Sequence, residues 1–225
     1  MSTILKVENV NYGYKDGQFR RQILTDLSYD FEEGKFYTIL GPSGSGKTTL
    51  LSILAGLDKA ESGSVKFKDE EVLSLGLHKY RRNKIAVVFQ SYNLLTYLTA
   101  AENILVAMEE TDNSVPKNKK EVAYELLARF GIGASKADRL VNRLSGGEQQ
   151  RVAIARALAS NVDLIFADEP TGNLDSATEV EIISIFKQLV EAYGKTVVVV
   201  THSNEVSKYS DHRLFLENGK LVEKE

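Results

Sequence analysis

A short glycine-rich segment near the start of the chain constrains its fold more than any other feature. Residues 41–49 read GPSGSGKTT, which fits the pattern G-x-x-x-x-G-K-[ST] of a phosphate-binding loop. An apolar stretch at 36–40 precedes this segment, and apolar residues at helical spacing follow it. The sequence therefore predicts a strand, a phosphate loop and a helix in that order. The flanking strand and helix disfavour the alternative that this segment is an ordinary glycine-rich turn.

The residue types in this loop suit a polyphosphate. Glycines let the backbone curl so that its N–H groups point inward, and the start of a helix adds positive potential. The Lys47 ammonium can then reach the β- and γ-phosphates of a nucleotide, and the Thr48 hydroxyl can ligate Mg²⁺. The candidate nucleotide-binding residues of the loop are Gly41, Ser43, Gly44, Ser45, Gly46, Lys47, Thr48 and Thr49.

Further motifs follow the phosphate loop in a fixed order. The segment LSGGEQQR at 144–151, here called the signature segment, lies before an apolar strand that ends in Asp168 and Glu169. The other segments are PTGNLD at 170–175, Thr201-His202 after an apolar run at 196–200, Gln90 after an apolar run at 85–89, and Tyr14 ahead of the first long apolar strand. Over essentially its whole length, the chain resembles the ATP-binding-cassette (ABC) transporter ATPases.

The resemblance implies a role for each matching residue, with ATP and Mg²⁺ as the bound groups. Glu169 orients the attacking water and accepts its proton, His202 contacts the γ-phosphate, and Lys47 completes the catalytic set. Tyr14 stacks on adenine. The metal set comprises Thr48, Gln90 and Asp168, of which Asp168 acts through water and Gln90 links the metal to the permease contact.

Several of these residues also have a purely structural alternative. Asp168 could cap the loop that follows it, Glu169 could be a surface acid, and His202 could be a satisfied histidine at a strand end. An acid at the carboxyl end of a strand, however, lies where open α/β sheets bind ligands. Tyr12 shares a strand face with Tyr14 and could stack on adenine in its place.

The signature segment calls for a second subunit. Ser145 opens a helix whose first amides, freed by Gly146 and Gly147, form an anion site. Lys47 and its neighbours already cradle the same phosphates from one side. In the ABC family the signature segment of one subunit closes on the ATP held by another, so the resemblance implies an ATP-dependent homodimer with Asp175 near its seam. The departures from the family pattern, such as Glu148 for glutamine, do not touch the phosphate chemistry.

Composition predicts one self-sufficient domain, 1–225, that does not enter a membrane. A chain of 225 residues buries roughly 70% of its unfolded surface. The net charge of −3 argues against a general nucleic-acid surface. Cysteine is absent, so neither disulfides nor thiol chemistry are available. No apolar run approaches the ~20 residues that span a bilayer, and the first residues lack a signal-peptide pattern.

The order of elements predicts an α/β fold around a phosphate loop, and the resemblance implies the ABC ATPase form of the phosphate-loop NTPase fold. Strands alternating with helices around a phosphate loop imply a mainly parallel core sheet. The part before about Phe67 reads as antiparallel strands, with turns at 15–17 and 32–34. A helical subdomain, 91–160, is inserted in the core and includes a helix at 119–130. A helix near 177–193 and a strand at 196–201 follow, and the polar stretch 111–120 is a flexible loop.

The amino-acid sequence in and around the motifs resembles that of one bacterial group of ABC ATPases. This group serves lipoprotein release, macrolide efflux, antimicrobial-peptide resistance and cell division, and residues 92–95 (YNLL) most resemble the peptide-resistance and export systems. The resemblance implies a separate transmembrane permease that holds the chain at the cytoplasmic face of the membrane. Residues 91–98 form a candidate contact for a permease helix, the alternative being a buried helix start. The rival function is a cell-division type of signalling without transport; an ATPase acting on ribosomes or DNA is disfavoured, because neither a second cassette nor a long coiled coil is present.

Overall fold

The computed structural model describes residues 2–16 and 19–224, and its strands form two sheets. The antiparallel sheet has the order β2-β1-β4-β5 and contains β1 (Thr3–Asp16), β2 (Phe19–Glu32), β4 (Ser62–Phe67) and β5 (Glu70–Glu71). The other sheet has the order β10-β9-β3-β8-β7-β6. Its strands are β3 (Phe36–Leu40), β6 (Ile85–Phe89), β7 (Leu164–Asp168), β8 (Thr196–Val200), β9 (His212–Glu217) and β10 (Lys220–Glu223). All its pairings are parallel except that of β9 with β10.

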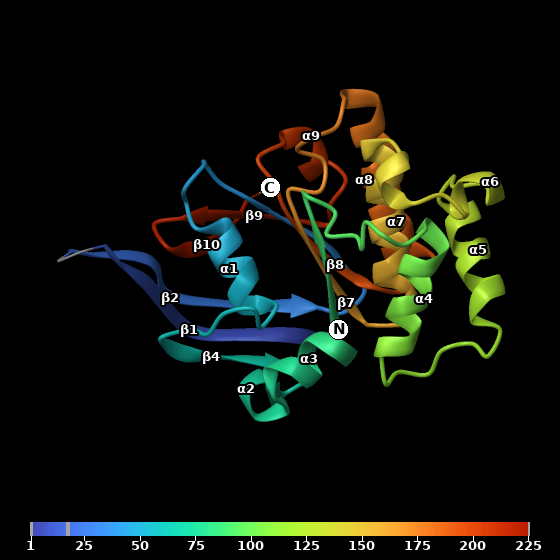
Figure 1. The fold of residues 1–225 in the computed structure, drawn as a ribbon. Coiled ribbons are helices and arrows are strands. Elements are labelled where there is room, and N and C mark those ends of the chain that lie inside the picture. The colour runs from blue at the N-terminus through green and yellow to red at the C-terminus, as the bar shows by residue number, and fades with distance from the viewer. Residues whose placement is uncertain (1, 17–18, 225) are drawn as a thin grey trace.

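The longer helices of the middle region stand together beside the parallel sheet, away from the antiparallel sheet (Figure 1). The helices are α1 (Lys47–Leu54), α2 (Val72–Leu75), α3 (Leu77–Asn83), α4 (Ala100–Glu110), α5 (Lys119–Arg129), α6 (Ala134–Ala137), α7 (Gly146–Ala159), α8 (Ser176–Glu191) and α9 (Asn204–Ser207), with a 3-10 turn at Val141–Arg143. The helices α4 to α7 all fall within 91–160. The bounds of an inserted subdomain stay a prediction.

The alternation of side chains along the central strands divides the interior into two cores. Successive residues of a strand point to opposite faces. Phe166 of β7 and Val198 of β8 therefore join the core that contains α1 and the antiparallel sheet. Ile165 and Val197 join the core formed with α4, α5, α7 and α8. The helix α1 packs against strands of both sheets within one core. These contacts hold the phosphate loop at the start of α1 in place.

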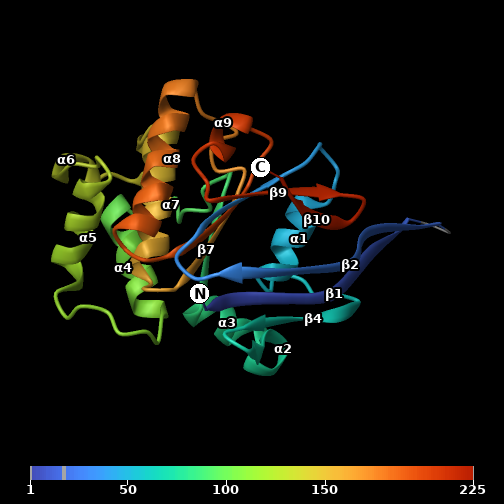
Figure 2. The ribbon, with the colours of Figure 1, turned by 180° about the vertical axis from the view of Figure 1, so that it is seen from behind.

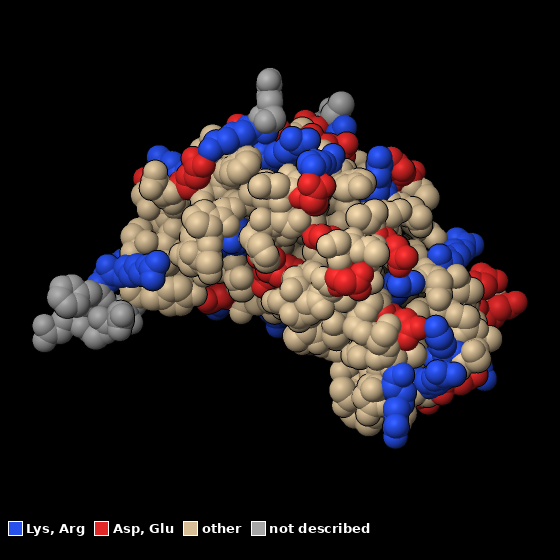
Figure 3. All heavy atoms as spheres, turned by 90° about the horizontal axis from the view of Figure 1, so that it is seen from above, with Lys and Arg blue, Asp and Glu red and all other residues tan. Residues whose placement is uncertain are grey.

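The β9–β10 hairpin connects the two sheets at one edge. Figure 2 shows this hairpin from behind, with β2 and β1 running beneath it. The Tyr29 hydroxyl of β2 donates a hydrogen bond to Glu223 of β10 over 3.0 Å. Acidic and basic side chains are interspersed over the face shown in Figure 3, in agreement with the small net charge.

The predicted fold class is confirmed, with one correction in the first part of the chain. The strands before Phe67 form an antiparallel sheet as predicted, except that β3, the strand predicted ahead of the phosphate loop, pairs within the mainly parallel sheet. Every residue of β3 is buried, as expected of a central parallel strand covered on both faces. The turn predicted at 32–34 is present, with Gly34 at φ +67°. The turn predicted at 15–17 depends on Gly17, which lies outside the described residues.

The later elements follow the sequence closely. The helices predicted at 119–130 and near 177–193 correspond to α5 and α8, and the strand at 196–201 corresponds to β8. Residues 111–118 are irregular as predicted. The Asn113 side chain nevertheless ties this loop to the end of α7 by donating to the backbone oxygens of Ser160 and Asn161, over 3.0 and 3.1 Å. Of the helices that the structure describes, none has the length and apolarity needed to cross a membrane.

Candidate functional site

The phosphate loop connects β3 to α1, as the sequence predicts. Gly44 and Gly46 have φ values of +75° and +102°, a region that favours glycine because it has no Cβ. A Cβ added at Gly46 would also lie 2.4 Å from Cγ2 of Ile23 on β2. Gly46 is therefore required both by its backbone conformation and by the close approach of β2.

Lys47, the first residue of α1, is held by the loop itself. Its side chain is buried, and its Nζ donates hydrogen bonds to the carbonyl oxygens of Gly41 and Pro42, over 2.8 and 3.1 Å. These bonds anchor the ammonium inside the loop without engaging a carboxylate. The Lys47 charge consequently stays available to an anion.

A hydroxyl and a carboxylate from different elements meet beside Lys47. Thr48 Oγ1 donates to Oδ1 of Asp168, at the end of β7, over 3.3 Å. Burial raises the pKa of Asp168 and nearby Glu169 adds to the rise, while the Thr48 hydrogen bond and the Lys47 charge oppose it. A low-dielectric site around this carboxyl group would strengthen its interaction with a cation.

These two groups fit Mg²⁺, with the Thr48 hydroxyl as a ligand and the Asp168 carboxylate acting through water. Both offer hard oxygen donors, which Mg²⁺ prefers. The described part of the chain contains no cluster of three or more His, Cys, Asp or Glu side chains that could form an all-protein cage. An ion at Thr48 and Asp168 would therefore keep water and substrate oxygens as its other ligands, which is usual for Mg²⁺ at phosphates.

Glu169 and His202 form a hydrogen-bonded pair at the ends of neighbouring strands. Oε2 of Glu169 lies 2.8 Å from Nδ1 of His202, and the two side chains are 20% and 70% exposed. The acid is thus mostly covered, and the imidazole bonded to it faces solvent. Glu169 has φ +47°, an uncommon conformation for a residue other than glycine, and such strained residues cluster at functional sites.

One cavity of about 400 Å³ brings most of the predicted residues together. It is lined by Tyr14, Arg21, Ile23, Ser43, Gly44, Gly46, Lys47, Thr48, Thr49, Glu169 and His202. Arg21 and Ile23 are functional candidates that the sequence alone did not reveal. They come from β2, which pairs with the strand of Tyr14. The pairing of β2 with β1 is not visible in the sequence pattern. Only the observed register, with Arg21 opposite Tyr14, identifies Arg21 and Ile23 as candidates.

Position favours Tyr14 over Tyr12, although the stacking of Tyr14 on adenine stays a prediction. Tyr14 is 48% exposed, lines the cavity, and its hydroxyl lies 3.1 Å from Thr49 Oγ1. The Tyr12 hydroxyl is instead bonded to Asp58, 2.5 Å away. The Tyr12 ring packs edge-on against Tyr14, with ring centroids 5.2 Å apart, and so supports it.

Gln90 and Asp175 do not line this cavity. The Gln90 amide nitrogen donates to Oδ1 of Asn173 over 3.1 Å, and a Cβ on Gly172 would lie 2.7 Å from it. Its predicted role at the metal stays a prediction. Asp175 caps α8 by accepting from the amides of Ala177 and Thr178, and these hydrogen bonds lower the pKa of Asp175.

The signature segment lies at the start of α7, and none of Ser145, Gly146 and Gly147 is among the described residues that line the cavity. Ser145 caps the helix: its hydroxyl accepts from the Glu148 amide, and the Glu148 carboxylate accepts from the Ser145 amide. A Cβ on Gly146 would lie 2.8 Å from the Tyr92 hydroxyl. A Cβ on Gly147 would lie 2.5 Å from the Thr178 side chain. Neighbouring segments of the same chain thus leave no room for side chains here.

Comparison with known proteins places these features in one family. A sequence model described as "ABC transporter" matches residues 24–172. The chain is 43% identical to the uncharacterized ABC transporter ATP-binding protein YclH of Bacillus subtilis, over 99% of this chain and 97% of YclH. It is 39% identical to the macrolide export ATP-binding/permease protein MacB of Syntrophobacter fumaroxidans, over 96% of this chain and 31% of MacB.

Solved structures agree with the sequence comparison. The chain resembles MJ0796 of Methanocaldococcus jannaschii, solved as a dimeric ABC transporter cassette, with a TM-score of 0.89 and 40% identity over 99% of this chain and 98% of that one. A second structure of MJ0796, a dimer in a post-hydrolysis state with ADP and Pi, gives the same TM-score at 39% identity, over the same shares of the two chains.

Proposed function

Because this chain belongs to the ABC transporter ATPase family and is an ATP hydrolase of that type, we propose that it powers a membrane permease carried on a separate chain. The observation that carries the proposal is the single cavity in which the phosphate loop, Tyr14, Glu169 and His202 meet. ATP fits this arrangement because an aromatic ring, a phosphate cradle and an acid line the same space.

Three side chains of the cavity have proposed tasks in hydrolysis. Lys47 neutralises charge on the phosphates, and the loop amides bind them. Glu169 accepts the proton of the attacking water, which its carboxylate also orients. His202 bonds to Glu169 through Nδ1, which leaves Nε2 as its atom for the γ-phosphate and fixes the orientation of the acid.

The cation belongs beside these residues. Thr48 and Asp168 would hold Mg²⁺, which would supply positive charge to neutralise the charge that develops on the phosphates. Asp168 is placed for this by the end of β7, and the Thr48 hydroxyl by the first turn of α1. Gln90, one residue beyond β6, would link this site to the permease contact.

A second copy of the chain would complete the site. The start of α7 presents Ser145 and two glycines whose amides form an anion site, yet they do not line the cavity of their own chain. The dimers solved for MJ0796 support an arrangement in which the signature segment of one subunit closes on ATP held by the other. Asp175 would lie near the seam of such a dimer.

The permease contact is proposed next to residues 91–98, at the cytoplasmic face of the membrane. A hollow of about 230 Å³ is lined by small side chains such as Ala107 and Ala153 and by charged ones such as Arg156, and none of residues 91–98 lines it. Arg156 connects the two, because its guanidinium donates to the Tyr92 and Asn93 carbonyl oxygens. Tyr97 is 73% exposed, which disfavours the alternative of a buried helix start.

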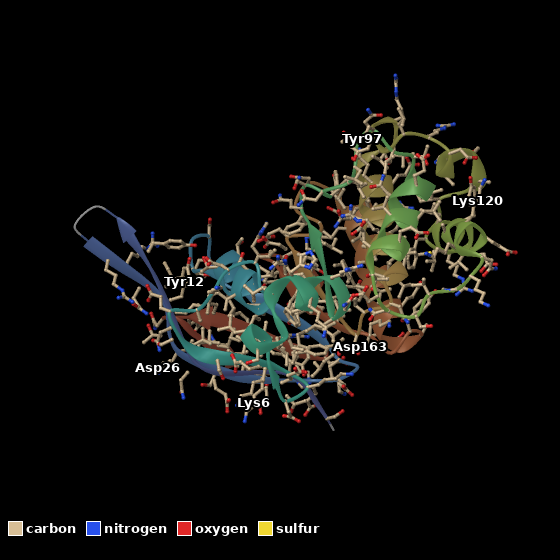
Figure 4. All side chains as sticks on the ribbon, turned by 60° about the horizontal axis from the view of Figure 1, so that its bottom comes forward. Lys6, Tyr12, Asp26, Tyr97, Lys120 and Asp163 are labelled. Carbon is tan, nitrogen blue, oxygen red and sulfur yellow. The ribbon has the colours of Figure 1, made fainter. Side chains whose placement is uncertain are left out.

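Cross-linking from Tyr97 tests this contact. Figure 4 shows Tyr97 at the upper edge of the helical part, apart from the exposed Lys120. The native chain has no cysteine, so Tyr97→Cys carries a thiol-reactive photo-cross-linker at one position. In membranes that contain the permease, the labelled Tyr97→Cys variant should cross-link to the permease. The labelled Lys120→Cys variant is the control and should not. Absence of a cross-link from every position between 91 and 98 would exclude this docking site.

The transported material is proposed to be an antimicrobial peptide, an antibiotic, or a peptide or lipid-linked substrate for export. The YNLL segment at 92–95 and the similarity to MacB support this class. The alternative is an envelope-regulating ATPase of the cell-division type that signals through its membrane partner. A transport assay with the reconstituted permease separates the two functions, because only the first moves a substrate for each ATP consumed.

Removing the Lys47 charge tests the nucleotide site directly. Lys47→Ala should weaken ATP binding about 10- to 100-fold, since a charge-assisted hydrogen bond contributes about 1.5–3 kcal/mol. The measurement is titration calorimetry of purified protein. Lys59→Ala, a change at an exposed lysine outside the cavity, serves as the control and should bind ATP normally. Undiminished affinity in Lys47→Ala would contradict the phosphate-loop assignment.

A further inference from the structure

We propose that Arg21 is a phosphate-binding residue of the nucleotide site, an inference that rests on the proposed ATP-binding function. Arg21 belongs to β2 and lies outside every motif that identifies the family. It is exposed, it lines the cavity of Lys47 and Glu169, and it carries the one arginine guanidinium among the described lining residues.

The strand register directs Arg21 toward the site. Arg21 is the partner of Tyr14 in the β1–β2 pairing. Directly opposed side chains of an antiparallel pair lie on the same face of the sheet, so Arg21 stands beside the ring proposed to stack on adenine. Ile23, two residues further along β2, lines the same cavity, and its Cγ2 would lie 2.4 Å from a Cβ added at Gly46 of the phosphate loop.

The contacts of Arg21 favour phosphate over base. Its Nη2 lies 3.4 Å from the carbonyl oxygen of Gly44, within the phosphate loop. Among the side chains that the structure describes, no carboxylate forms an ion pair with Arg21. This long contact with one carbonyl leaves most of the five guanidinium donors free. A planar guanidinium at the lip of a phosphate loop matches the oxygens of a phosphate chain.

The neighbouring Arg20 lies outside the cavity and provides a matched control for Arg21. Arg20 is also exposed and lies on the same strand, but its guanidinium is paired with Glu61, and it does not line the cavity. Arg20→Gln and Arg21→Gln therefore remove the same charge at adjacent positions, and only the second change lies at the nucleotide.

The test compares the affinities of Arg21→Gln, Arg21→Lys, Arg20→Gln and the wild type for ADP and GDP. We expect Arg21→Gln to weaken both diphosphates by the same factor, roughly three- to tenfold, since the contact is charge-assisted but exposed. Arg21→Lys should recover most of the loss, and Arg20→Gln should show none. With ATP as substrate, Arg21→Gln should raise KM with little change in kcat, as loss of uniform binding requires.

Three outcomes are distinguishable. A changed ratio of ADP to GDP affinity in Arg21→Gln would place the guanidinium at the base and overturn the proposal. Equal affinities of Arg21→Gln and the wild type would also overturn it, and unchanged thermal unfolding of the variants rules out misfolding as the cause of any loss. Failure of the wild type to bind either diphosphate would instead contradict the proposed function.

Discussion

Glu169→Gln should bind ATP as the wild type does and hydrolyse it about 10²–10⁴ times more slowly, the usual loss when one positioned general base is removed. The amide keeps the shape of the carboxylate, so the nucleotide cavity stays formed. The amide of Glu169→Gln, however, cannot accept a proton from the attacking water. Single-turnover hydrolysis and ATP titration of the purified variant measure the two effects separately.

Glu169→Gln should also accumulate as a dimer in ATP. If hydrolysis opens the proposed dimer, a chain that binds ATP and cannot cleave it stays closed. Size-exclusion chromatography with and without ATP reports this shift. Glu179→Gln, on α8 and outside the cavity lining, is the control and should hydrolyse ATP normally. Wild-type turnover by Glu169→Gln would remove Glu169 from its role as base.

The features predictable from the sequence are those specified by local pattern. The phosphate loop is specified by glycines, a lysine and flanking apolar residues that are adjacent in the chain. Asp168 and Glu169 follow a continuous apolar run, and the end of a buried parallel strand is where such acids meet a ligand. His202 follows β8, which pairs with β7, so its contact with Glu169 is a consequence of parallel register.

The features that were not predictable depend on contacts between distant segments. Arg21 and Ile23 enter the site only through the pairing of β2 with β1. The crowding of Gly147 by Thr178 joins residues on α7 and α8, and no local pattern records it. The sheet that β3 joins was not predictable either, because its partners β8 and β9 lie more than 150 residues away in the chain.

The central claim is that each active site is shared between two chains, and the contacts at the start of α7 determine which variants can test it. Gly147→Asp is unsuitable, because its Cβ would collide with Thr178 inside the same chain. Ser145 is exposed and caps α7, and Asp caps a helix as well as Ser does. Ser145→Asp therefore keeps the helix and adds a negative charge where the phosphates of a partner should lie. Ser145→Asn is the neutral control.

Homodimers of Lys47→Ala and of Ser145→Asp should both be nearly inactive, because each carries a lesion in both composite sites. Ser145→Asn should lose much less activity than Ser145→Asp, since it keeps the cap and adds no charge. In a mixed dimer, one site combines the undamaged phosphate loop of Ser145→Asp with the undamaged signature segment of Lys47→Ala. The other site carries both lesions.

Single-turnover ATP hydrolysis by an equal mixture of Lys47→Ala and Ser145→Asp is the most direct test, because coupling between sites cannot hide one working site in a single turnover. The shared site predicts recovery to roughly a quarter of the wild-type amplitude, since random pairing places half of the chains in mixed dimers with one undamaged site each. A site built within one chain predicts no recovery. No recovery in a sample where mixed dimers are shown to form would contradict the shared site.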